Sequence, residues 1–156
     1  MRNVLIGIDP GVSGGIAVAT SNLAPLTVDA VKMPDTPKGI LDMLDSLRTG
    51  CDSVSCVCEK VGTYRPGNSA ISACKFARHC GGLEMALIAL QIPTIYVTPH
   101  KWMKTLGSMP KEKSERKRFI KNLMEQQYPH LKVTLATADA LGILTYGIRN
   151  QQLSLS

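Results

Sequence analysis

The segment VLIGIDPGVSGGIAVAT, residues 4–20, decides the fold that the sequence predicts. Val4 to Ile8 is a continuous apolar run rich in β-branched residues, which is typical of a strand buried at the centre of a sheet. Asp9-Pro10-Gly11 ends this run, and a glycine-rich connection leads into a second apolar run, Ile16 to Thr20. The segment therefore predicts two neighbouring antiparallel strands joined by a tight turn, with an aspartate at the end of the first.

The rest of the chain predicts a mixed α/β sheet covered by helices. Further strands are expected at residues 26–32, 53–58 and 94–97, and helices at 38–48, 69–90, 99–106, 111–126 and 137–149. Because helices link the third strand to the fourth and the fourth to the fifth, the later strands are expected to run parallel to their neighbours. Gly81-Gly82 predicts either a break in the long helix or a close packing contact, and Thr137 is a candidate N-cap.

Length and composition predict one globular domain, residues 1–150, with a polar tail at residues 151–156. A chain of 156 residues, of which 44% are hydrophobic and 19% charged, is ordinary for one soluble domain. No apolar run is long enough to cross a bilayer, and the N-terminal run ends at Asp9, so it predicts a strand and not a signal peptide. Five cysteines without such a signal favour reduced thiols in a cytoplasmic protein over disulfides or a structural zinc site.

The positive charge is concentrated in one segment. The chain has a formal net charge of +6, and Lys111 to Lys121 (KEKSERKRFIK) holds six basic and two acidic residues. A cluster of this kind is typical of a surface that binds a polyanion such as a nucleic acid. A solvated helix face has the same composition, so the segment alone leaves both interpretations open.

Acidic residues stand at the ends of three predicted elements. Asp9 follows the first strand, Glu59 ends the fourth, and Asp139 stands at the start of the last helix. Each has a simpler explanation as a turn residue, a solvated strand end or an acid favoured by the helix dipole, respectively. For each residue, position alone leaves open both this simpler explanation and a role in a functional site.

Taken together, the three acids predict a metal site. If the first and fourth strands are parallel neighbours, their ends lie about 4.8 Å apart, so Asp9 and Glu59 meet at one edge of the sheet. Two carboxylates held there are unfavourable unless a proton or a cation separates them. Asp139, on a helix that packs on the sheet, is expected at the same edge. Such a set favours Mg²⁺ or Mn²⁺, and two ions about 4 Å apart could activate a water for in-line attack on a phosphodiester.

Three stretches resemble the motifs of the RuvC-like Holliday-junction resolvases, a family of the RNase H-like superfamily. They are IGIDPGVSGGIAV at residues 6–18, CVCEKVG at 56–62 and TADALGIL at 137–144. Between them, CGGLEMALIALQIP at 80–93 and YVTPHKWMKTL at 96–106 resemble the helix and the following strand-turn of the same family. The first motif also fits other RNase H-like proteins, including sugar kinase-like ATPases, whereas the series in this order is more specific.

The resemblance implies an RNase H-like α/β fold, in which three antiparallel strands and then parallel strands form a five-stranded mixed sheet flanked by helices. It implies a crossover junction endodeoxyribonuclease, a homodimer that nicks opposed strands of a four-way DNA junction and leaves ligatable ends. Asp9, Glu59 and Asp139 would then bind Mg²⁺ or Mn²⁺, two ions in each active site. The small size fits a bacterial or bacteriophage member in the cytoplasm, and no membrane partner is expected.

One position departs from the family pattern. The family usually has another Asp or His three residues before the final aspartate, and here that position is Ala136. A ligand could come from elsewhere in the chain, three acids and more waters could suffice, or this chain could be an inactive variant. The sequence leaves these three explanations open, and with them the activity of this chain.

Basic and aromatic residues near the motifs are the candidate DNA contacts. Lys111 and Lys113 are expected to contact phosphates and to stabilise charge at the scissile one, and hence to take part in catalysis. Tyr64 either stacks on unpaired bases or packs on its own domain, and Ser13 either binds a phosphate or caps the turn. The predicted DNA-binding residues are Ser13, Tyr64, Arg65, Lys75, Arg78, Lys104, Arg116, Lys117, Arg118 and Lys121.

Two further functions remain open. A different RNase H-like nuclease, acting on hybrids, flaps or forks, would need the same acids, and Ala136 also allows a junction-binding protein without catalysis. The helix expected at residues 69–90 is too apolar for a single buried face, so part of it is expected to form a dimer interface.

Overall fold

The chain folds around one five-stranded mixed sheet, as the sequence predicts. A computed structural model describes residues 1–22, 25–62 and 67–150. The strand order in the sheet is β3-β2-β1-β4-β5. The strands are β1 (Arg2–Asp9), β2 (Gly15–Asn22), β3 (Thr27–Lys32), β4 (Ser53–Glu59) and β5 (Thr94–Val97). β2 pairs antiparallel with β1 and β3, and β4 pairs parallel with β1 and β5.

Five helices cover this sheet within the described residues. They are α1 (Pro37–Arg48), α2 (Ala70–Ala89), α3 (Pro99–Lys104), α4 (Lys113–Gln127) and α5 (Leu135–Arg149). α2 runs through Gly81-Gly82 without a break, and a Cβ at either glycine would meet nothing within 4 Å, so neither the break nor the close packing contact that the pair predicts is found within the described residues. α4 begins at Lys113, and Lys111 therefore precedes the basic helix.

The start of α5 differs from the prediction. Thr134 is the N-cap, and Thr137 sits one turn inside, where its hydroxyl accepts a hydrogen bond from the Thr134 N–H. The two threonines form a capping box, so Thr137 contributes to the cap without being the N-cap itself. As a result Asp139 lies inside the helix and not at its first residue.

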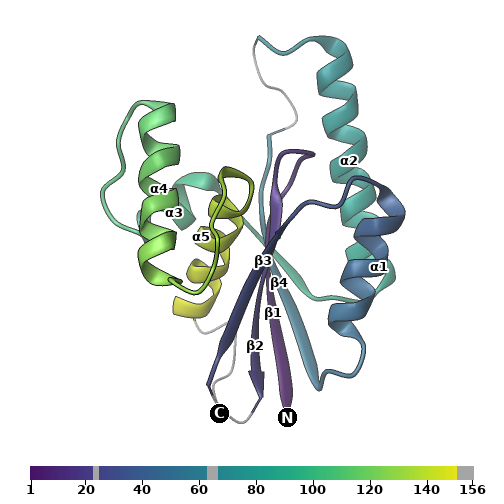
Figure 1. Cartoon of the computed structure of the whole chain (residues 1–156). Coiled ribbons are helices and arrows are strands. Elements are labelled where there is room, and N and C mark those ends of the chain that lie inside the picture. Colours follow the sequence, from purple (N-terminus) through teal and green to yellow (C-terminus); the bar gives the residue numbers. More distant parts are fainter. Residues whose placement is uncertain (23–24, 63–66, 151–156) are drawn as a thin grey trace.

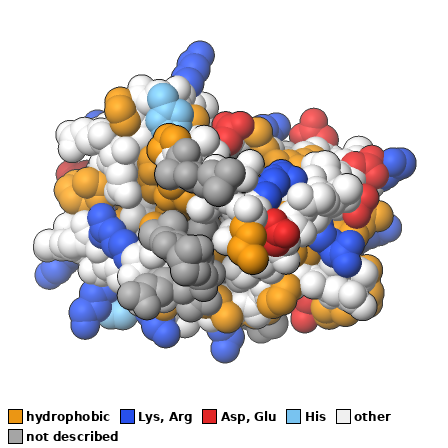
Figure 2. All heavy atoms as spheres, turned by 90° about the horizontal axis from the view of Figure 1, so that it is seen from below, with side chains coloured by type: hydrophobic (Ala, Val, Ile, Leu, Met, Phe, Trp, Pro, Cys, Tyr) orange, Lys and Arg blue, Asp and Glu red, His pale blue; other side chains and the backbone are white. Residues whose placement is uncertain are grey.

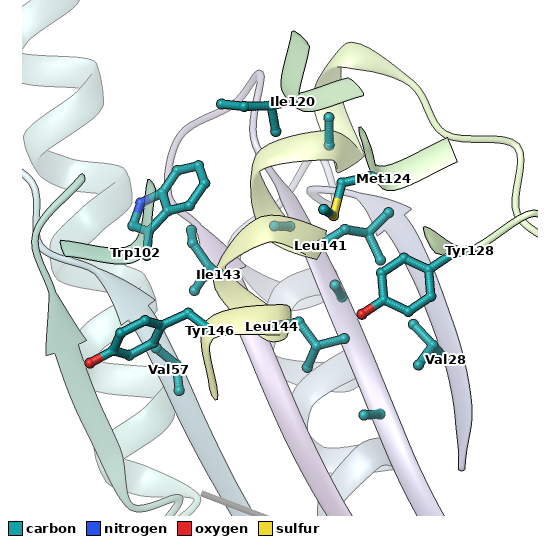
Figure 3. Close-up of a cluster of buried hydrophobic side chains, with 14 of the residues drawn as sticks. Val28, Val57, Trp102, Ile120, Met124, Tyr128, Leu141, Ile143, Leu144 and Tyr146 are labelled. Carbon is teal, nitrogen blue, oxygen red and sulfur yellow. The ribbon is translucent and has the colours of Figure 1, made fainter. Parts of the chain in front are cut away.

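The helices form two layers, one on each face of the sheet (Figure 1). Val4, Ile6 and Ile8 point toward α1 and α2, while Leu5 and Val57 point toward α3, α4 and α5, because side chains alternate along a strand. Figure 3 shows the second of these cores, in which Trp102, Met124 and Leu141 from three helices pack together above the strands. β1 is therefore buried on both faces, as its continuous apolar run predicts.

Two glycines allow α5 to lie directly on the sheet. A Cβ at Gly7 would be 2.7 Å from the backbone nitrogen of Leu144, and one at Gly15 would be 2.5 Å from the carbonyl oxygen of Ala136. Any larger residue would push the helix away. The close approach brings the first turns of α5 to the end of the sheet at which β1 ends, which is where Asp9 lies.

The cysteines form no disulfide in the structure, and two of the five, Cys56 and Cys58, are buried. Burial raises the pKa of the Cys56 thiol to about 12 and shifts the pKa of Cys58 in the same direction, so both are protonated at neutral pH. Among the described helices, none combines the length and the apolar character that a membrane span requires.

Candidate metal and DNA-binding site

One cleft brings the three predicted acids together. It has a volume of about 470 Å³ and is lined by the connection between β1 and β2, the end of β4, and residues of α2, α3, α4 and α5. Asp9, Glu59 and Asp139 all line it, although they are far apart in the sequence. The expectation that they lie at one edge of the sheet is therefore met.

Strand register fixes the first two acids. Ile8 on β1 is the partner of Cys58 on the parallel strand β4, so the residues that follow them, Asp9 and Glu59, leave neighbouring strands at the same level. Gly14 N–H donates a hydrogen bond to the carbonyl oxygen of Gly11 and closes the tight turn after Asp9. The glycine-rich connection thus returns the chain quickly and leaves the sheet edge open above both carboxylates.

Glu59 is held by a residue that sequence reasoning did not assign to the site. The indole Nε1 of Trp102 donates a 2.7 Å hydrogen bond to Glu59 Oε2, and both side chains are buried. A buried tryptophan needs a partner for its N–H, and this general requirement is the only signal in the sequence that points toward an acceptor.

Asp139 reaches the cleft from the side of α5. Burial raises the pKa of its carboxyl above the usual range, while the nearby Lys117 and Arg116 of α4 act in the opposite direction. A carboxylate shielded from water in this way gains from any added cation, because desolvation disfavours its charged form. The helix-dipole explanation for Asp139 loses weight, since the residue lies beyond the first turn of α5.

The donor set fits a hard divalent cation, although the described side chains do not form a closed ligand cluster. All three acids offer oxygen atoms, which Mg²⁺ and Mn²⁺ prefer. Among the described residues, no group of three or more His, Cys, Asp or Glu side chains is close enough to hold an ion. Ala136, one turn before Asp139, adds no ligand atom. Asp9, Glu59 and Asp139 are the residues of this cleft that would supply oxygen ligands to such an ion.

Basic side chains from two helices surround the acids. Lys113, Arg116 and Lys117 of α4 and Lys75 of α2 line the cleft, and so does Ser13. Arg116 Nη1 also donates to the carbonyl oxygen of Lys111 at 3.1 Å, which fixes the connection that leads into α4. The basic segment is therefore more than a solvated helix face, because one side of it is turned toward the acids.

Other predicted residues lie elsewhere. Lys121 forms a 2.5 Å ion pair with Glu125 along α4, and Arg78 lines a separate groove beside the cleft. The residues that line the cleft do not include Lys104, Lys111, Arg118 or Lys121. Tyr64 and Arg65 lie outside the described residues.

Positive charge does not gather at the opposite end of the molecule. Figure 2 shows the surface at the end where the N-terminus lies, away from the connection between β1 and β2. On the visible part of this surface, Lys and Arg side chains are dispersed among acidic and uncharged ones. The association of several basic residues with acids in the cleft is thus a feature of the other end of the sheet.

The order of strands, the parallel addition of β4 and β5 and the helix packed across β1 and β2 define an RNase H-like fold. The sequence matches no family model and no curated protein. The structure is similar to Thermus thermophilus RuvC in complex with a Holliday junction substrate, with a TM-score of 0.57 and 19% identity over 94% of this chain and 95% of RuvC.

Two other resolvases have similar structures. The Fowlpox virus resolvase, in complex with Holliday junction DNA, gives a TM-score of 0.55 at 14% identity over 98% of this chain and 99% of that chain. The yeast mitochondrial Holliday junction resolvase gives a TM-score of 0.54 at 18% identity, over 95% of this chain and 78% of that chain. At these identities the similarity shows the fold: this chain has the RNase H-like fold found in RuvC and related resolvases, over nearly its whole length.

Proposed function

We propose that this protein is a metal-dependent endonuclease that resolves four-way DNA junctions. The observation that carries the proposal is the cleft in which Asp9, Glu59 and Asp139 face basic residues of α4, on the fold of RuvC and related resolvases. Acids that can hold divalent cations, beside cations that can hold phosphates, are what phosphodiester hydrolysis needs.

Each group of side chains has its own task. Asp9, Glu59 and Asp139 would hold one or two Mg²⁺ or Mn²⁺ ions, which would supply Lewis acidity at the phosphate and lower the pKa of an attacking water. Lys113, Arg116 and Lys117 bind the strand through its phosphates and offset negative charge near the scissile one. Trp102 keeps the Glu59 carboxylate oriented toward the cleft. These contacts to the DNA phosphates position the DNA without reading its sequence.

We also propose that the protein acts as a homodimer that pairs through α2. Three large apolar residues of this helix, Ile71, Met85 and Ile88, are exposed, and their spacing of 14 and 3 residues fits one stripe of a coiled-coil seam; Ile71 is 70% exposed. Ile95 and Tyr96 on the edge strand β5 are exposed as well. A two-fold dimer would present two clefts to a junction that has two-fold symmetry.

The dimer is tested by sedimentation. Met85→Glu should convert the protein to a monomer, because the charge would be buried against the second copy. Lys38→Glu, on the exposed surface of α1, serves as the control. A monomeric wild-type protein at all concentrations would contradict the proposed dimer.

The nuclease proposal is tested with a synthetic four-way junction and Mg²⁺. Asp9→Asn should keep junction binding and lose cleavage, because it removes a metal ligand without changing the fold. Asp45→Asn, an exposed acid on α1, is the matched control and should cleave like the wild type. Unchanged cleavage by Asp9→Asn would exclude Asp9 from the mechanism.

Two further measurements separate the remaining alternatives. Competition among four-way, forked, flap and hybrid substrates identifies the structure that the protein prefers, and a clear preference for a linear hybrid would favour another RNase H-like nuclease. Ala136→Asp tests the missing ligand. A large gain in nicking would show that Ala136 limits catalysis and would favour the junction-binding alternative for the wild type, whereas no change would show that a ligand at position 136 is not required.

A further inference from the structure

A second groove lies beside the cleft, on the α1 and α2 face of the sheet. It has a volume of about 270 Å³, and its walls are mostly apolar, with Val12, Pro34, Ile40 and Leu83 among them. Val12 is 59% exposed at the tip of the connection between β1 and β2. Uncovered apolar surface of this kind is typical of a binding site, because water wets it poorly.

The groove is continuous with the candidate active site. Val12 and Lys75 line both the groove and the cleft that holds the three acids. Arg78, one turn further along α2, lines the groove as well. A ligand in the groove would therefore have an apolar body between the walls and negative charge near Lys75 and Arg78, toward the cleft.

A buried polar atom in the groove lacks a partner. His79 lines the groove, and its Nε2 is inaccessible to solvent and has no hydrogen-bond partner among the described residues. Because Nε2 is inaccessible, a ligand in the groove would contact His79 through the accessible part of its ring, which is half-buried. Asp35 also lines the groove, and its carboxylate, which pairs with Lys32 at 3.4 Å, could in addition accept from an amino group.

The helix leaves room for such a ligand. Gly82 lines the groove, and a Cβ added to it would meet nothing within 4 Å. Glycine inside a helix lowers helix stability, and no contact within the described chain requires it here. The space above Gly82 is therefore open to a molecule that comes from outside the chain.

We propose that this groove receives one unstacked nucleobase of a DNA strand whose phosphates lie in the adjacent cleft. The inference rests on the proposed function, and it adds a site for a single base next to the site for the backbone. A nucleobase has apolar faces for the walls and the His79 ring, a polar edge for Asp35, and a phosphate attached on the side of Lys75 and Arg78. Unpaired bases at a branch point can be extruded at lower cost than bases in a duplex.

The first experiment tests the groove without a junction. Deoxynucleoside 5′-monophosphates are titrated into the protein without divalent metal, and the imidazole signals of His79, assigned with His79→Gln, are followed by NMR. We expect these signals to shift and saturate in the wild type. Gly82→Leu, which fills the groove, should weaken nucleotide binding by about tenfold or more. Gly82→Ala, which leaves most of the groove open, should keep the response.

The second experiment uses a four-way junction with 2-aminopurine in place of individual bases next to the branch point. Binding of the wild type should change the fluorescence at one position, and Gly82→Leu should abolish that change while junction binding persists. No His79 shift with any nucleotide, or equal responses from both Gly82 variants, would overturn the groove proposal.

The two proposals fail in different ways. Absence of junction binding by the wild type would count against the proposed function, and the nucleotide titration would still decide the groove. If Gly82→Leu changed the sedimentation of the protein and left the His79 response intact, the groove would belong to a contact between two copies, and the nucleobase proposal would be wrong.

Discussion

Trp102 on α3 and Glu59 at the end of β4, 43 residues apart in the sequence, are joined by a 2.7 Å hydrogen bond in the buried wall of the cleft. The indole donates and the carboxylate accepts. The Trp102 ring also packs against α5, where a Cβ at Gly142 would lie 2.6 Å from it. The carboxylate is therefore held by the same core that joins α3 and α5 to the sheet.

Replacing Trp102 by Phe should lower the free energy of unfolding by about 1.5–3 kcal/mol, because a buried charged acceptor loses its donor. Junction cleavage should fall as well, since Glu59 is no longer oriented. Urea unfolding and a cleavage assay measure the two effects. A double-mutant cycle with Glu59→Gln isolates the interaction of the pair, and a coupling energy near zero would show that the hydrogen bond contributes nothing.

Replacing Gly7 by Ala should destabilise the protein strongly, by about 3 kcal/mol or more, since the new Cβ would meet backbone atoms of Ala140 and Leu144 at 2.7–2.8 Å. Gly81→Ala provides the opposite control. The added Cβ meets nothing within 4 Å, so this variant should raise the free energy of unfolding by about 0.5–1 kcal/mol through helix propensity. Thermal unfolding of both variants tests these two predictions. Equal changes in stability for Gly7→Ala and Gly81→Ala would contradict the close packing of α5 on β1.

Removing positive charge from α4 should weaken junction binding in a salt-dependent way. Each lost phosphate contact should reduce the slope of log K against log salt concentration by about 0.9. Lys113→Gln combined with Lys117→Gln is the test, because both residues line the cleft. Lys38→Gln, which breaks an exposed ion pair with Asp42, is the control. Identical salt slopes for the wild type and the double variant would remove α4 from the DNA interface.

Glu112 should give α4 a pH-dependent contribution to stability. Its carboxylate caps the helix by accepting from the Ser114 hydroxyl and from the Ser114 and Glu115 N–H groups. These hydrogen bonds lower the pKa of Glu112 from its usual 4.5 to about 2. The contribution is therefore fully present above about pH 4.5 and is lost as the pH falls toward 2.

The pH dependence is checked with Glu112→Gln. The difference in unfolding free energy between this variant and the wild type should be largest near neutral pH and should shrink as the medium is acidified below pH 4.5. A difference that stays constant over this range would mean that the charged form of Glu112 has no special role in the cap.

Much of the fold could be predicted from local patterns. The apolar run of β1, the following Asp9-Pro10-Gly11 and the glycine-rich turn define a strand and its end, because burial on both faces demands uninterrupted apolar residues. The sequence predicts the start of α5 two residues too late and its N-cap three residues too late. Thr137 resembles an N-cap in sequence, but Thr134 takes that position and Thr137 completes the capping box.

The sequence by itself therefore determined most of the strands and helices and placed Asp9 and Glu59 at strand ends, since these follow from residue type and spacing along a short segment, whereas the pairing of β1 with β4 came from the structure. Only the tertiary structure decided that Trp102 holds Glu59 and that Arg116 and Lys117 lie near Asp139, while Lys121 pairs with Glu125. These relationships depend on how helices pack over the sheet, where close contacts at Gly7 and Gly15 fix α5 and, through it, α4. Contacts between distant segments come from the packing of the whole core, which no local pattern encodes.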